Sequence, residues 1–259
     1  AFEKCQKALF GGDFDIVILN GIDQLLNQSL PPMDDILSLL EEKPKHVELV
    51  VSGSKIPQNI IDKSDYVTEM VMHKQEFSNG IENSPADTGA IEVITGNGKG
   101  KTTYCLGKGL LVSGTGVPTL ILQFIKSPKL YGEVKAIQKL PHLEIKSMGK
   151  GFISKNVMHH DPKHKKAARQ AWDHCLRLIN SQEFGLIVLD ELNIAINYEL
   201  ISASRIADWL LNTPPKLSVL LSGRHAHPDV ARACTTLIEM KEIKHPYKRG
   251  VKARKGIEF

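Results

Sequence analysis

The sequence predicts an α/β fold of the P-loop type, RecA-like or Rossmann-like, with a mostly parallel sheet that carries helices on both faces. From residue 89 onward, short apolar segments alternate with helical patterns. A glycine-rich turn follows the first apolar segment and opens a helix. A later apolar segment ends in two carboxylates. Because ligands of such sheets bind at the carboxyl ends of the strands, both features are expected at one edge.

Each predicted element follows from its residue pattern. Apolar runs bounded by turn residues indicate buried strands, and apolar residues spaced by three and four indicate helices. Gly114 and Gly116 close the first helix. The expected strands are 91–95, 119–124, 143–148, 186–190, 217–222 and 237–243, and the clearest helices are 101–113, 162–179, 203–211 and 227–233. Their alternation predicts right-handed βαβ units.

Composition excludes several classes of protein. The 259 residues are 42% hydrophobic and 24% charged, which rules out a disordered, collagen-like or coiled-coil chain. The longest apolar runs fall far short of the roughly 20 residues of a membrane span, so no membrane is expected. A net charge of +4 suits anionic ligands without requiring nucleic acid. The four cysteines, without a C-x-x-C pair, argue against zinc or disulfides and favour the cytoplasm.

An internal repeat relates the two ends of the chain. Adding 170 to a position in the first eighty residues reaches a similar residue near the C-terminus, almost without gaps. Shared apolar periodicity could produce part of this match by chance. It does not explain the matched pairs, in which Ser52-Gly53 and Glu69-Met70 correspond to Ser222-Gly223 and Glu239-Met240.

The repeat predicts the domain organisation. Residues 1–74 correspond to the C-terminal half of a degenerate copy, 75–88 form a polar linker, and 89–259 form a complete domain. A half-copy exposes surfaces that its missing half would cover. We therefore expect either that the natural protein extends upstream or that this half docks elsewhere.

The glycine-rich turn predicts a phosphate site. Residues 95–103, here called the P-loop, read TGNGKGKTT between a strand and a helix. Backbone N–H groups of such loops bind phosphate oxygens, and Lys101 and Thr102 have the side chains that contact phosphate and Mg²⁺. The usual first glycine is Thr95 here. A plain βα turn is the structural alternative. The predicted ATP-binding residues are Gly96, Asn97, Gly98, Lys99, Gly100, Lys101, Thr102, Thr103 and Arg224.

Two adjacent carboxylates predict a metal site. Asp190 and Glu191 end the apolar run 186–190, a position from which a second strand helps to hold Mg²⁺ near a P-loop. An Asp at this position can also serve only as a helix cap. With Thr102, they are the expected magnesium ligands. The first copy has Asn20 and Gly21 instead, so it is not expected to bind Mg²⁺ in the same way.

Several motifs in order resemble one family. They are similar to the motifs of the P-loop ATP:corrinoid adenosyltransferases. The matching segments are the P-loop, Gln123–Lys126, Met148–Phe152, Asp190–Leu192, Ser222–Arg224 and a tail that contains His245–Tyr247, Gly250–Ala253 and Lys255–Phe259. The resemblance covers the whole second copy, and the first copy resembles the later part of the same family.

This resemblance implies an activity. Such enzymes transfer the 5′-deoxyadenosyl group of MgATP to Co(I) of a reduced corrinoid, such as cob(I)alamin, and release triphosphate. An electron donor supplies Co(I). Lys101, Thr102 and Glu191 are the expected catalytic residues. The family generally forms dimers, so a homodimer, or a pseudo-dimer through the repeat, is expected.

The resemblance also implies a corrinoid pocket. Phe152 and Ser154 are its expected corrinoid-binding residues, and the family has Trp where this chain has Ser154. A glutamine of the family's tail is Arg254 here. The change at Ser154 favours the main alternative, a non-catalytic protein that binds ATP or a corrinoid. A general P-loop ATPase fits the downstream motifs less well.

Overall fold

The computed structural model describes residues 2–28, 31–75, 89–128, 131–151, 162–181, 183–214, 216–245 and 250. The chain forms two compact units, Ala1–Val67 and Thr68–Phe259. The division lies at the start of strand β3 (Val67–Gln75), upstream of the boundary at residue 74 that the repeat suggests. Strand β3 therefore belongs by sequence to the first copy and by contacts to the second unit.

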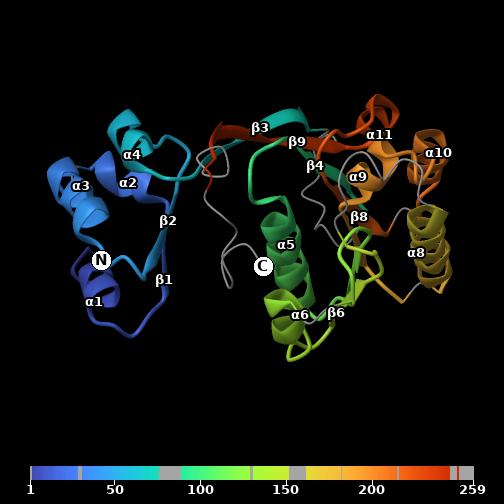
Figure 1. Cartoon of the computed structure of the whole chain (residues 1–259), viewed down its shortest axis with the longest axis horizontal. Helices are drawn as coiled ribbons and strands as arrows, with labels where there is room; N and C mark the ends of the chain where they lie inside the picture. The colour runs from blue at the N-terminus through green and yellow to red at the C-terminus, as the bar shows by residue number, and fades with distance from the viewer. Residues whose placement is uncertain are drawn as a thin grey trace. The chain divides into compact units, whose positions relative to one another are not determined.

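The second unit contains a seven-stranded sheet in the order β3-β9-β4-β8-β7-β5-β6 (Figure 1). The pairs β4–β8, β4–β9, β7–β8, β5–β7 and β5–β6 are parallel. This confirms the predicted α/β fold class with a mostly parallel sheet. The strands are β4 (Ile91–Thr95), β5 (Thr119–Gln123), β6 (Leu143–Ser147), β7 (Leu186–Asp190), β8 (Ser218–Ser222) and β9 (Thr236–Lys244).

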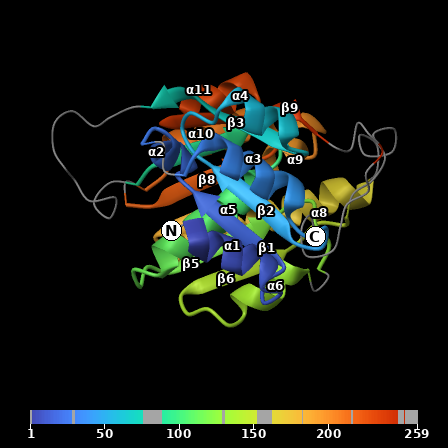
Figure 2. The same ribbon diagram turned by 90° about the vertical axis from the view of Figure 1, so that its left-hand side faces the viewer.

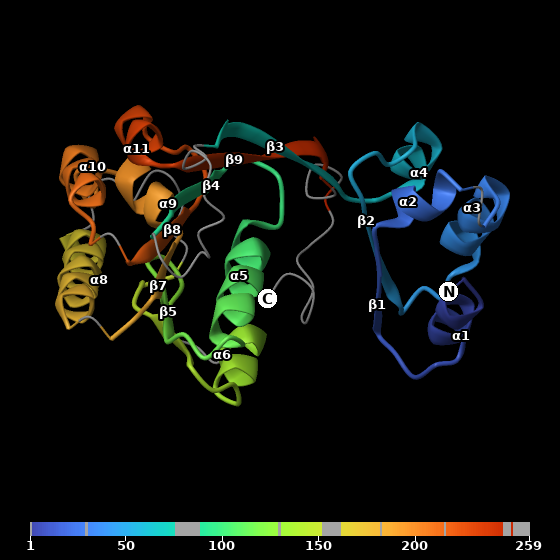
Figure 3. The same ribbon diagram turned by 180° about the vertical axis from the view of Figure 1, so that it is seen from behind.

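Helices cover both faces of this sheet (Figures 1 and 3). On one face lie α5 (Lys101–Ser113) and α6 (Gly132–Ile137). On the other lie α8 (Pro162–Asn180), α9 (Leu192–Asn197), α10 (Ala203–Leu211) and α11 (Pro228–Ala233). Among the described helices, none combines the length and apolar character needed to cross a membrane.

Alternation along β7 explains how one strand serves two cores. Val188 packs into the cluster that includes Cys105 of α5, whereas Leu189 packs into the cluster that includes Trp172 of α8. All five residues of β7 are buried. Successive side chains of a strand point to opposite faces, so a strand covered on both sides is apolar throughout.

The predicted elements of the second copy agree with the structure to within one residue at most ends. The prediction lacked two short helices, α6 and α9, each of six residues. Helices this short span less than two turns and leave little periodic pattern to detect. The prediction also lacked β3, although the repeat pairs its sequence with that of β9.

The first unit contains the counterparts of β7 and β8. Its strands β1 (Ile16–Asn20) and β2 (Glu48–Ser52) form a two-stranded parallel sheet (Figure 2). Ile18 is 65% exposed, whereas its counterpart Val188 is fully buried. Among the described residues of the first unit, the sheet face that α5 covers in the second unit is therefore exposed. Its helices are α1 (Phe2–Phe10), α2 (Ile22–Leu26), α3 (Met33–Glu42) and α4 (Gln58–Lys63).

Candidate nucleotide and metal site

The P-loop connects β4 to α5 and rests on the backbone of β9. Gly98 N donates a hydrogen bond of 2.7 Å to Met240 O. A Cβ atom on Gly98 would lie 2.7 Å from the same oxygen, so a larger residue would push the loop off the strand. Gly96 and Gly100 have φ of 92° and 105°, which L side chains rarely adopt. The glycine spacing is therefore required by the loop's shape and by its close contact with β9.

Lys101 begins α5 and turns back over the P-loop. Its Nζ donates to Gly96 O at 2.8 Å and to Gly98 O at 2.6 Å. Burial and the nearby Arg224 lower the pKa of Lys101 to about 8, although Glu191 and Asp190 act in the opposite direction. A bound phosphate would raise this pKa again, because its negative charge stabilises the charged ammonium of Lys101.

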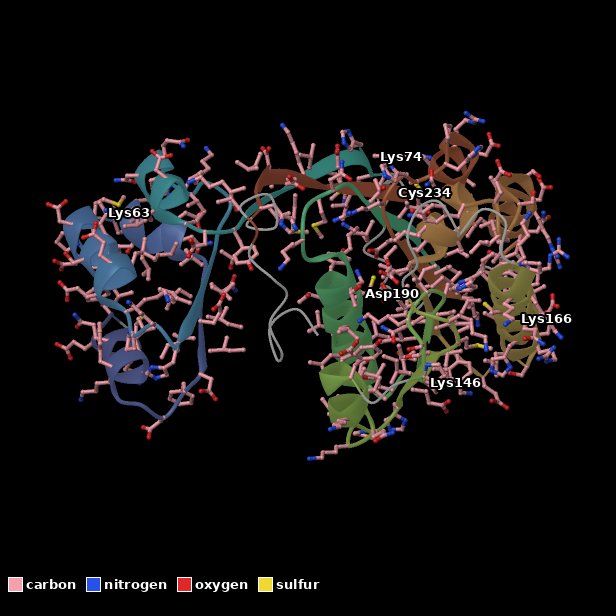
Figure 4. All side chains as sticks on the ribbon, viewed as in Figure 1. Lys63, Lys74, Lys146, Lys166, Asp190 and Cys234 are labelled. Carbon is pink, nitrogen blue, oxygen red and sulfur yellow. The ribbon has the colours of Figure 1, made fainter. Side chains whose placement is uncertain are left out.

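Asp190, at the end of β7, accepts hydrogen bonds from three side chains. The donors are Ser222 Oγ at 2.6 Å, Thr102 Oγ1 at 3.1 Å and Gln123 Nε2 at 3.2 Å. Ser147 Oγ in turn donates to Gln123 Oε1 at 2.6 Å, which fixes the orientation of that amide. The carboxylate, fully buried beside α5 (Figure 4), is thus held by donors from both neighbouring strands and from α5.

Glu191 differs from Asp190 in its surroundings. Its backbone N donates to Ser222 Oγ at 3.0 Å, and its φ is 63°. Its Oε2 is buried and, among the described residues, has no hydrogen-bond partner. Burial and the charge of Asp190 raise the pKa of Glu191 to about 8, against the opposing effect of Lys126, Lys101 and Arg224. A buried carboxylate without a donor is costly, and a cation at this position would remove that cost.

Lys126 adds a further positive charge near these carboxylates. Its Nζ lies 2.6 Å from Glu133 Oε1 and 5.3 Å from the ring centre of Tyr131. Both members of the ion pair are largely buried. Burial raises the pKa of Glu133, but hydrogen bonds from Lys126, from its own backbone and from Gln123, together with the charge of Lys126, lower it overall. The pair fixes the ammonium of Lys126 close to the site.

A cavity of about 370 Å³ opens above the P-loop. The predicted residues Gly98–Thr103, Glu191 and Arg224 line it together. Gly96 and Asn97 do not line it, because Gly96 lies against β9 and Asn97 is exposed. Phe152 and Ser154 lie outside the described residues.

Four pocket-lining residues and one supporting residue were missing from the predicted site. The lining residues are Ile194, Ser222, Gly223 and His245, and the supporting residue is Gln123, which donates a hydrogen bond to Asp190. Ser222 was detectable as part of the Ser-Gly pair that both copies share. Its contact with the carboxylates could be recognised only from the strand order, because β8 lies between β4, which precedes the P-loop, and β7.

The first copy keeps the serine contact of this site but lacks both carboxylates. Ser52 Oγ donates to Asn20 Oδ1 at 2.7 Å, as Ser222 does to Asp190. The described structure thus repeats the serine contact, while an amide replaces the carboxylate and Gly21 replaces Glu191.

The site as a whole has the form of a P-loop that lies beside two adjacent carboxylates. The family model described as ATP:corrinoid adenosyltransferase BtuR/CobO/CobP matches residues 1–86 and again residues 87–259. The chain belongs to this family of transferases, whose substrates are ATP and a corrinoid and which serve cobalamin biosynthesis. Two successive matches agree with the internal repeat.

Three relatives illustrate the similarity. A corrinoid adenosyltransferase of Pseudomonas aeruginosa is 33% identical over 67% of this chain and 85% of its own length. One from a Sinorhizobium species is 30% identical over 76% of this chain and 93% of its own. An uncharacterized protein of a Nostoc species is 28% identical over 100% of this chain and 70% of its own.

Proposed function

We propose that the second unit transfers the 5′-deoxyadenosyl group of MgATP to the Co(I) centre of a reduced corrinoid and releases triphosphate. The observation that carries the proposal is the pocket that Lys101, Thr102, Glu191 and Arg224 line together, with the buried Asp190 bonded to Thr102. Adenosyl transfer to a corrinoid is the activity of the family.

In this reaction the cobalt electron pair forms the Co–C bond at C5′ as the bond between C5′ and O5′ breaks. That bond's electron pair stays on the triphosphate oxygen, and Co(I) becomes Co(III). Because Co(I) is the nucleophile, no activated Ser, Cys or His is needed. The chain's task is to position ATP and to stabilise the growing negative charge of the triphosphate.

Lys101 is the main candidate for that stabilisation. Its Nζ lies at the two carbonyls of Gly96 and Gly98, within the loop that would hold the phosphates. Backbone N–H groups at the start of α5 and the exposed guanidinium of Arg224 would act on the same charge.

The residues around Glu191 fit a magnesium ion. The buried Oε2 without a donor is an oxygen ligand of the kind that Mg²⁺ prefers. Magnesium sites of nucleotide-binding proteins commonly use one or two carboxylates together with substrate phosphates. Thr102, Asp190 and Glu191 would hold it. Bound there, the ion would neutralise charge on the phosphate chain.

Further partners follow from the same proposal. A reductant must supply Co(I), and the corrinoid would bind near Phe152 and Ser154. A homodimer, or a pseudo-dimer formed with the first copy, would complete the assembly. The absence of the family's Trp at position 154 makes transfer itself the decisive measurement.

The test follows the absorbance of chemically reduced cob(I)alamin with MgATP and measures triphosphate in parallel. We expect loss of the cob(I)alamin band with an equal amount of triphosphate. Lys101→Ala should lower this rate at least about 100-fold. Lys108→Ala is the matched control, because Lys108 lies on the same helix and pairs with Glu92 at 2.8 Å. Binding of both substrates without transfer, or formation of ADP and phosphate, would refute the proposal.

A further inference from the structure

Strands β3 and β9 are the same segment of the two copies, paired with each other. Adding 170 to the bounds of β3 gives 237–245, and β9 spans 236–244. His73 Nε2 lies 2.8 Å from Glu239 Oε2, and Lys241 Nζ lies 3.4 Å from Glu69 Oε2. Residue numbers rise along β3 as they fall along β9, so the pair is antiparallel. Their midpoints, residues 71 and 240, differ by one position in the repeat.

Such a pairing has the geometry of an interface between two identical copies. Two equal strands that meet in opposite directions about a common centre are related by a two-fold axis. Here both strands lie in one sheet of the second unit. The first copy therefore contributes a strand to the unit that carries the P-loop.

The inner strand of this pair supports the P-loop directly. Gly98 N is bonded to Met240 O, and Gly96 lies so close to β9 that a Cβ atom there would be 2.4 Å from the same oxygen. Two of the loop's three glycines, Gly96 and Gly98, thus lie against the carbonyl oxygen of Met240 in β9. Any shift of β9 would move the loop and the phosphate-binding N–H groups with it.

The outer strand also reaches the loop by two routes. A Cβ atom on Gly98 would lie 2.8 Å from Cγ2 of Thr68, so the threonine methyl covers that glycine. At the other end, His73 contacts the carboxylate of Glu239. A Cβ atom on Gly96 would lie 2.8 Å from Cγ of the same Glu239. Two side chains of the first copy therefore act on two glycines of the second copy's P-loop.

A third contact fixes β3 to the body of the second unit. Lys74 Nζ donates to Cys234 O at 2.5 Å and to Arg232 O at 3.2 Å (Figure 4). These carbonyls lie at the C-terminal end of α11, where a cation is favourable. The strand is thus tied to the unit beyond its ladder with β9.

We propose that Thr68 and His73 of the degenerate copy are positioning residues for the P-loop of the active copy. The first copy has lost its own carboxylates but supplies in the same chain the edge strand that a second copy would supply. Because this inference rests on the proposed ATP site, MgATP binding is measured before any variant is compared.

The experiment uses the full chain and calorimetric titration with MgATP in the absence of corrinoid. Thr68→Ser removes the methyl over Gly98 but keeps the hydroxyl. Thr68→Val keeps a methyl there and replaces the hydroxyl with a second methyl. We expect Thr68→Ser and His73→Gln each to raise the Kd for ATP about fivefold, and Thr68→Val to bind as the native chain does. Met72→Ala is the control, since Met72 is 50% exposed on the same strand.

Steady-state kinetics separates positioning from a general loss of stability. Positioning predicts a higher KM for ATP with an unchanged KM for the corrinoid in Thr68→Ser and His73→Gln. If both variants bind ATP as tightly as the native chain, or if Met72→Ala weakens ATP to the same extent, the inference is wrong. Failure of the native chain to bind MgATP would instead refute the proposed function.

Discussion

Removing the hydroxyl of Ser222 should weaken both the fold and the site. Ser222 is fully buried, donates to Asp190 Oδ1 at 2.6 Å and accepts from Glu191 N at 3.0 Å. Ser222→Ala deletes a hydrogen bond to a carboxylate and leaves a backbone N–H without its acceptor, each worth about 1 to 3 kcal/mol. We expect a loss of about 3 kcal/mol in the free energy of unfolding. For a domain of this size the unfolding midpoint should fall by roughly 6 to 12 °C.

Urea and thermal unfolding followed by circular dichroism measure this loss. Ser218→Ala is the matched control on the same strand, because Ser218 Oγ accepts one long hydrogen bond of 3.3 Å from Ala90 N. That variant should lose about 1 kcal/mol or less. In folded Ser222→Ala, the KM for MgATP should also rise, since Asp190 is less firmly held. Equal stability losses in the two variants would refute the reasoning about the Asp190 network.

Three further predictions concern Lys101, Glu191 and α5. Binding of ATP without magnesium should weaken as the pH rises through about 8, because Lys101 loses its charge there. ATP titrations at pH values from about 6 to about 10 measure this, and an affinity that stayed constant over that range would contradict the prediction. The pKa of Glu191 is raised from 4.5 to about 8, so this group destabilises the fold increasingly between those values. In EDTA, Glu191→Gln should therefore be more stable than the native chain at pH 8 and equally stable near pH 4.5, as measured by the midpoints of urea unfolding. Equal midpoints at pH 8 would show that the charge of Glu191 does not destabilise the fold. Gly107→Ala should raise the free energy of unfolding by about 0.5 to 1 kcal/mol, since Gly107 is exposed in α5 with no atom within 4 Å of an added Cβ; a loss would overturn this.

The sequence was most informative where local pattern and burial agree. Strand 91–95 and helix 101–113 were predictable to the residue, because a short apolar run, glycines and an amphipathic pattern each mark a boundary. The candidate phosphate and carboxylate residues were identifiable for the same reason, since motif spacing is a local property. The short helices α6 and α9 were missed because they are positioned by packing and leave little periodicity in the sequence.

By itself, then, the sequence determined the fold class, the family, the repeat and the residues of the P-loop and carboxylate motifs. Only the tertiary structure showed that Ser222 joins Asp190 to Glu191, and that Gln123 and Ser147 hold the same carboxylate. It alone placed β3 beside β9, so that Thr68 covers Gly98. The physical reason is that these contacts depend on strand order. Residues 98 and 68, or 190 and 222, become neighbours only when the sheet aligns strands that are distant along the chain.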